Sequence, residues 1–306
     1  MDTPALLQCL ATFALNLALA WMVGALTARW WLRRHDGWGA AAGARLLASL
    51  RWAAPLCMVA AAAALWAAAA AMAGAPLLES GEALRLLLTQ TAFGKAGQAG
   101  LAALAVLAAL AWLAPSWRGF DGAASALLLA YAASRVANSH AAEQGLFSLG
   151  ILVEYVHLLL IAQWTGSVAV AAWVVLPRAA AARGQAGLAT VAPNRPLCRY
   201  LWPLSDTAAA ALVGIVATGL YNAWHALGAP SAAIGNPYGT ALIVKLVLVG
   251  VAIALGGYNK MAGFPAAARG DSPGPAMAVL RIESAVLIGA MLAAAALVGQ
   301  QPPAAG

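Results

Sequence analysis

Long apolar stretches alternate with short polar segments along the whole chain. Each stretch contains about 20 largely apolar residues, enough for a helix to cross a hydrocarbon core of ~30 Å. Apolar residues occupy every face of these stretches, whereas a helix at the surface of a soluble domain is apolar on one face only. The pattern predicts eight membrane spans, at residues 5–28, 52–73, 94–114, 122–140, 148–177, 204–226, 238–260 and 278–299.

We therefore expect an all-α fold, a polytopic membrane helix bundle of about eight transmembrane helices. The polar segments between the spans are too short to hold a soluble domain, so residues 1–306 are expected to form a single integral membrane domain. We expect residues 5–28 to remain as the first span. No basic residue precedes their apolar core, unlike in a cleaved signal peptide.

The basic residues cluster in alternate segments between the predicted spans. They are Arg29, Arg33, Arg34, Arg45 and Arg51 after the first span, Arg118 after the third, Arg178, Arg183, Arg195 and Arg199 after the fifth, and Lys260 and Arg269 before the eighth. Arg and Lys favour the cytoplasmic side of a membrane, so these segments are expected there and both termini on the periplasmic side. The same rule accounts for the net charge of +7 without a nucleic-acid partner, since no soluble basic domain is present to bind one. The expected partner is the lipid bilayer.

Only 9% of the residues are charged, yet Arg135, Glu154, His157 and Lys245 fall inside or at the edge of predicted spans. A charge in hydrocarbon costs several kcal/mol unless it faces a partner or a water-filled cavity. At about 1.5 Å per residue, all four lie about 8 to 13 Å below the outer surface. Glu154 and His157 are three residues apart and share a helix face. We predict a polar vestibule on the outer side, in which Glu154 and Lys245 match in depth; a plain interhelical ion pair is the alternative for those two.

Five side chains are candidate metal ligands on the outer side: His140, His157, His225, Met72 and Met291. Imidazole binds copper, zinc, iron or nickel, and thioether suits Cu(I). The alternative for each histidine is a hydrogen-bonded packing role.

A second polar group is expected near the cytoplasmic side: Asp206, Tyr258, Asn259 and Glu283. One interpretation is the exit of a pathway that begins at His157. The interpretation that the sequence favours is an ordinary interfacial ion pair between Arg281 and Glu283.

Several chemistries lack their sequence signatures. The chain has no Gly-rich phosphate loop, no HExxH motif and no nucleophile elbow, which argues against an enzyme and against an ATP-driven pump. The three cysteines, Cys9, Cys57 and Cys198, have no CxxC spacing and indicate neither a disulfide framework nor a thiolate metal site.

The second half of the chain resembles the copper resistance protein D family over residues 138–303. The motifs that carry the resemblance are His140-Ala141-Ala142, His157 followed by Trp164-Thr165-Gly166, Thr218-Gly219-Leu220-Tyr221-Asn222, Pro237-Tyr238-Gly239, Lys245, Asn259, Arg281-Ile282-Glu283 and Pro302-Pro303. Ser139 and Ser167 stand where the family often has glycine, and neither change removes a candidate ligand.

The resemblance implies a multi-pass protein of the bacterial inner membrane that moves copper from periplasm to cytoplasm and serves copper homeostasis or resistance. It also implies a small periplasmic copper-binding protein as a partner. In this interpretation copper is captured near His140 and His157, while Arg135, Glu154, Lys245, Asn259 and Glu283 support the ligands or line the pathway.

Two other functions fit the same residues. A b-type haem held by His140 and His157 would make the protein a membrane electron carrier. An assembly subunit for copper delivery would need neither transport nor haem.

Overall fold

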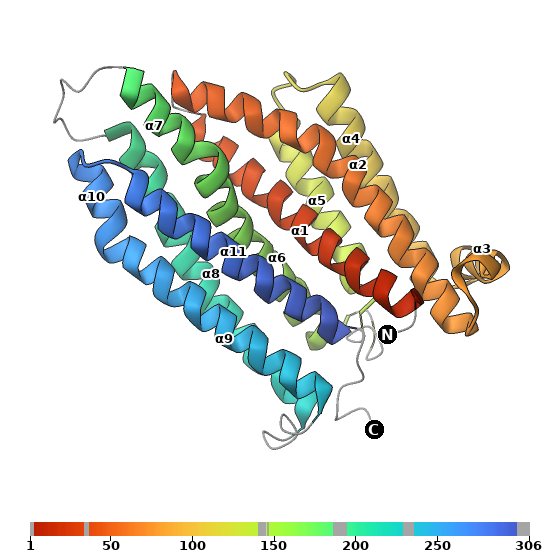
Figure 1. Cartoon of the computed structure of the whole chain (residues 1–306). Helices are drawn as coiled ribbons and strands as arrows, with labels where there is room; N and C mark the ends of the chain where they lie inside the picture. The colour runs from red at the N-terminus through yellow and green to blue at the C-terminus, as the bar shows by residue number, and fades with distance from the viewer. Residues whose placement is uncertain are drawn as a thin grey trace.

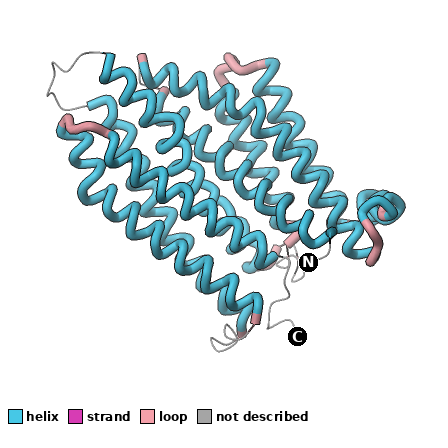
Figure 2. The backbone as a smooth tube through the Cα atoms, in the orientation of Figure 1, coloured by secondary structure: helices cyan, strands magenta, loops and turns pink. Residues whose placement is uncertain are grey.

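The computed structural model describes residues 3–33, 37–139, 145, 147–185, 195–228 and 236–298, and these form a bundle of long helices (Figure 1). Figure 2 shows helices joined by short loops, with no strand in the described part of the chain. The long helices are α1 (Thr3–Leu32), α2 (Trp38–Ala73), α4 (Ala92–Leu113), α5 (Phe120–Val136), α6 (Leu149–Val170), α8 (Arg195–Leu227), α9 (Pro237–Tyr258) and α11 (Gly274–Val298). The short ones are η1 (Leu77–Glu79), α3 (Gly81–Gln90), α7 (Leu176–Gln185) and α10 (Phe264–Arg269), together with the π-helical turns η3 (Ala171–Val175) and η5 (Asn259–Gly263).

The prediction of an all-α membrane bundle is confirmed. Among the described residues, seven helices are long and apolar enough to cross a membrane. The predicted fourth span is the shorter α5, which has 17 residues, because the chain leaves the helix in a turn at residues 137–139. α5 packs against α1, α4 and α6 within the bundle.

The two ends of the bundle differ in charge. α1 begins and α11 ends at the same end, which we call the terminal end (Figure 1). At the opposite, basic end, the Asp121 carboxylate accepts from Arg29 at 3.0 Å and from Arg33 at 2.8 Å, and Arg183 donates to the carbonyl of Gly270. The predicted basic segments therefore meet at one end. That the terminal end faces the periplasm stays a prediction.

Side-chain caps begin three of the long helices that start at the terminal end, α4, α6 and α9. The hydroxyl of Thr91 accepts from the backbone N–H of Gly94 at the start of α4, and Ser148 does the same for α6. The Asn236 side chain caps α9 by accepting from Gly239 at 2.7 Å. Each cap satisfies a backbone donor that the first turn of a helix leaves without an intrahelical partner.

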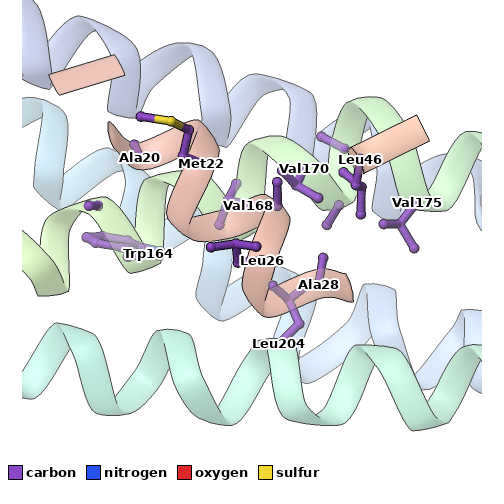
Figure 3. Packing of buried hydrophobic residues seen from close by; sticks show 14 of the residues in the cluster. Ala20, Met22, Leu26, Ala28, Leu46, Trp164, Val168, Val170, Val175 and Leu204 are labelled. Carbon is purple, nitrogen blue, oxygen red and sulfur yellow. The ribbon is translucent and has the colours of Figure 1, made fainter. Parts of the chain in front are cut away.

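The core lies around α1, which packs between α2 and α6 and also reaches α5, α8 and α11. Figure 3 shows Ala20 and Met22 of α1 in one packed cluster with Trp164 and Val168 of α6. Gly24 and Gly166 lie where the two backbones touch, because a Cβ on Gly166 would come within 1.8 Å of the carbonyl oxygen of Ala20. Small residues permit such close approach of membrane helices.

Candidate functional site

A cavity of about 440 Å³ lies inside the bundle toward the terminal end. All eight long helices contribute to its lining, α1, α2, α4, α5, α6, α8, α9 and α11. Most of the lining is apolar, but its polar residues include all four ionisable residues that the sequence placed in one outer layer: Arg135, Glu154, His157 and Lys245. Helices from both halves of the chain thus enclose one polar chamber.

The carboxylate of Glu154 is the only acidic side chain on the cavity wall among the described residues. Its Oε2 accepts from the Asn222 amide of α8 at 2.7 Å. Lys245 and Arg135 both interact with it electrostatically, and the Lys245 ammonium lies farther away than the 4.0 Å of a direct ion pair. Glu154 and Lys245 therefore line the same chamber without forming a direct ion pair.

Arg135 lines the chamber from α5. Its guanidinium donates to the side-chain oxygen of Asn16 on α1 at 2.7 Å. This bond joins α5 to α1 and leaves the positive charge at the chamber. With Arg135 and Lys245 positive and Glu154 negative, the described lining carries one more positive than negative formal charge.

His157 is nearly buried, with 8% of its surface exposed, and its ring orientation follows from its partners. Its Nδ1 lies 2.8 Å from the hydroxyl oxygen of Thr218. That hydroxyl donates its own hydrogen to the carbonyl of Gly214 at 2.6 Å, so it accepts from Nδ1–H of the imidazole. The Nε2 atom then keeps its lone pair, which is the atom that a neutral imidazole offers to a metal.

The predicted ligands do not all meet at this chamber. Met291 is buried and lines it, whereas Met72 is 68% exposed and lies outside it. His225 is exposed, stacks on Tyr221 and makes a hydrogen bond at Nδ1 with the Tyr221 carbonyl. His140 lies outside the described residues.

The structure adds polar residues that the sequence analysis did not single out as site residues. Asn16 and Asn222 hold Arg135 and Glu154, and Thr218 orients His157. Gly219 leaves room beside the imidazole, since a Cβ there would lie 3.4 Å from Cε1 of His157. Asn16 could have been recognised from the sequence as a candidate site residue, because it is a polar residue within an apolar span. Thr218 was named only as part of the motif Thr218-Gly219-Leu220-Tyr221-Asn222.

The described residues contain no group of three or more His, Cys, Asp or Glu side chains close enough to hold a metal ion. The described lining instead offers one imidazole and one carboxylate on α6 and one thioether on α11. Such a set suits loose binding of a passing cation better than the closed four-ligand shell of a structural metal site. For a haem, His157 is the one described histidine at the chamber, and the second histidine of that hypothesis is His140.

The four residues of the polar group predicted near the cytoplasmic side do not lie together in the structure. Asp206 binds Lys260 at 3.7 Å on the surface, and Tyr258 is exposed. Asn259 and Glu283 are buried. The predicted pair of Arg281 with Glu283 is wrong, because Glu283 accepts from the indole N–H of Trp164 at 3.2 Å and the Arg281 guanidinium lies over the ring of Trp173.

Comparison with protein families gives two matches. The family model described as copper resistance protein D matches residues 197–297. The model described as copper resistance protein D-like, N-terminal domain, matches residues 1–151, so the likeness extends through the first half of the chain as well. The comparisons with curated proteins and with solved structures gave no match.

Proposed function

Because this chain belongs to the copper resistance protein D family, we propose that it carries copper ions across the membrane through the chamber at the terminal end. Members of this family are multi-pass membrane proteins of copper resistance and copper transport. The proposed direction is from the periplasm, where the terminal end is expected, to the cytoplasm. A periplasmic copper-binding protein is the proposed donor of the metal.

One observation carries the proposal: His157 lies on the chamber wall with its Nδ1 hydrogen given to Thr218 and its Nε2 lone pair free. Glu154 lies one helical turn away on α6 and supplies the negative charge of the described chamber wall. The thioether of Met291, on the same chamber, is a ligand suited to Cu(I). We propose that these three side chains receive the metal in turn.

The test is the copper content of cells that express the protein, measured by elemental analysis against cells with an empty vector. Import predicts more copper in the expressing cells during copper exposure. Less copper than in the vector control would reverse the proposed direction. Equal copper at verified membrane abundance would reject transport and favour the assembly hypothesis, for which a copurifying partner is the expected finding.

Replacing Thr218 with valine is expected to weaken copper binding to the purified protein by about 10- to 100-fold, as loss of an orienting partner does in metal sites. Valine keeps the shape of threonine but cannot accept the hydrogen bond from His157. A copper titration of the detergent-purified variant measures the effect. Thr218→Ser, which keeps the hydroxyl, is expected to bind as the wild type does. Equal affinity in the valine variant would show that His157 needs no such partner.

Replacing Lys245 with methionine is expected to strengthen copper binding. Lys245 interacts electrostatically with both His157 and Glu154, so its ammonium repels a cation that binds there. The repulsion between two like charges several ångströms apart in a protein is about 1–2 kcal/mol, so removing it lowers the dissociation constant of copper about tenfold. Lys260→Met, at the surface salt bridge with Asp206, is the matched control. Unchanged or weaker binding in Lys245→Met would place the metal away from Glu154.

A further inference from the structure

Beyond the chamber, α11 carries a buried carboxylate, that of Glu283, and one of its oxygens accepts no hydrogen bond from the described residues. Glu283 is 2% exposed, and its Oε1 accepts from the indole N–H of Trp164 at 3.2 Å. Its Oε2 is buried and has no hydrogen-bond partner. Buried polar atoms in folded proteins nearly always have partners, so an acceptor without one needs an explanation.

The neighbouring helix leaves space for this carboxylate. Gly256 on α9 faces it, and a Cβ at that position would lie 3.1 Å from Oε1 and 3.7 Å from Oε2. Any larger residue there would press on the carboxylate. Two helices, α6 through Trp164 and α9 through Gly256, thus shape a pocket around the side chain of Glu283.

No described cation neutralises Glu283. Arg281, two residues earlier on α11, places its guanidinium over the ring of Trp173 at 4.9 Å. On α9 and η5, Lys245 lines the chamber and Lys260 binds Asp206 at the surface. A buried carboxylate without a counter-charge costs several kcal/mol, and an apolar residue would fold as well.

Glu283 lies directly beyond the chamber, on the side toward the basic end. Trp164 lines the chamber with its side chain and donates its N–H to Glu283. Leu287, which also lines the chamber, is one helical turn after Glu283 on α11. We call Trp164 and Leu287 the chamber floor, and Glu283 is the first acidic side chain beneath it among the described residues.

We propose that Glu283 and Trp164 form a second, inner station for the transported metal cation, at which Oε2 receives the cation as it passes the chamber floor. This inference rests on the proposed function and extends its path from the chamber toward the basic end. The negative charge of the carboxylate offsets the cost of moving a cation through the apolar interior of the bundle between the chamber floor and the basic end. In the empty protein, the indole N–H of Trp164 holds one carboxylate oxygen and leaves the other free.

The test measures copper binding and copper flux separately in purified protein and in liposomes that contain it. Glu283→Gln keeps the size of the side chain and an oxygen that accepts from Trp164, and it removes the charge. The expected result is copper flux at least tenfold below that of the wild type, with copper affinity at the chamber within twofold of wild type. Glu283→Asp keeps the charge and is expected to retain part of the flux. Ser284→Ala, beside it on α11, is the matched control with unchanged flux.

Three results would overturn the inference. Wild-type flux in Glu283→Gln would show that the charge is not needed. Loss of chamber affinity together with flux would show that Glu283 belongs to the chamber site rather than to a separate station. If wild-type liposomes take up no more copper than protein-free liposomes, the proposed function itself fails, and the inner station fails with it. Size-exclusion profiles equal to that of the wild type confirm that each variant is folded.

Discussion

Replacing His157 with alanine is expected to reduce the copper content of expressing cells to the level of the empty-vector control. His157 is the one imidazole at the chamber among the described residues, and its Nε2 is the free nitrogen ligand there. Alanine removes this ligand without adding bulk. The remaining described donors of our proposed set, Glu154 and Met291, then offer one hard and one soft ligand, which hold copper poorly by themselves.

The measurement is total cell copper by elemental analysis, with each variant matched for membrane abundance. His225→Ala is the control, because His225 is an exposed histidine outside the chamber and its loss removes the same chemical group. We expect copper gain in His225→Ala to equal that of the wild type. Full copper gain in His157→Ala would remove the central residue of the proposed mechanism. His140→Ala/His157→Ala then tests whether His140 acts in its place.

Replacing Gly166 with alanine is expected to prevent accumulation of folded protein. A Cβ at Gly166 would lie 1.8 Å from the Ala20 carbonyl oxygen and 2.9 Å from the backbone nitrogen of Gly24. These are backbone atoms, so no side-chain rotation relieves the contact, and α1 must move away from α6. Overpacking a core costs about 1–3 kcal/mol even where side chains adjust, and a contact between two backbones is expected to cost more.

Yield of monodisperse protein after detergent extraction, followed by size-exclusion chromatography, measures this effect. Gly250→Ala is the matched control on α9, since a Cβ at Gly250 meets nothing within 4 Å. We expect Gly250→Ala to give a wild-type yield and Gly166→Ala a small fraction of it. Similar yields for the two variants would mean that α1 and α6 separate at little cost.

The comparison of Gly166 with Gly250 shows that the sequence does not predict which glycines lie at a close contact between helices. Gly250 and Ala254 have the small-xxx-small spacing of helix contacts, and so do Gly214 and Thr218. In the structure Gly250 has open space beside it, while Gly214 faces a side-chain atom of Leu160. The close backbone approach of Gly24 and Gly166 also has this spacing, in Ala20 with Gly24 and in Ala162 with Gly166, so the spacing does not distinguish a close contact from an open face. Spacing along one helix says which residues share a face, and the partner helix decides what that face touches.

The candidate site likewise has some features that the sequence predicts and others that only the structure shows. That Glu154 and His157 share a helix face follows from the helical repeat, and their depth follows from the rise per residue. Neither rule predicts that Asn222 of α8 binds Glu154 or that Thr218 binds His157. For Arg281 and Glu283 the sequence predicted a contact that the structure does not contain. The two oppositely charged residues are close in sequence, but Arg281 lies over Trp173 and Glu283 accepts from Trp164.

The amino-acid sequence was enough to identify a multi-pass helical membrane protein of the copper resistance protein D family, and to show which few ionisable residues its apolar spans contain. The family rests on its motifs. The spans and their few charges follow from local composition, since the length and apolarity of each stretch suffice to span a bilayer and a charge within it is conspicuous. The sequence also predicted an outer vestibule from Arg135, Glu154, His157 and Lys245. The structure was needed to show that the four line one enclosed chamber, that Met72 and His225 lie outside it, and that Glu283 is buried beneath its floor. The physical reason is that these relations depend on how eight helices rotate and pack against one another. Packing rests on contacts between side chains far apart in the sequence, which the pattern along any one helix does not contain.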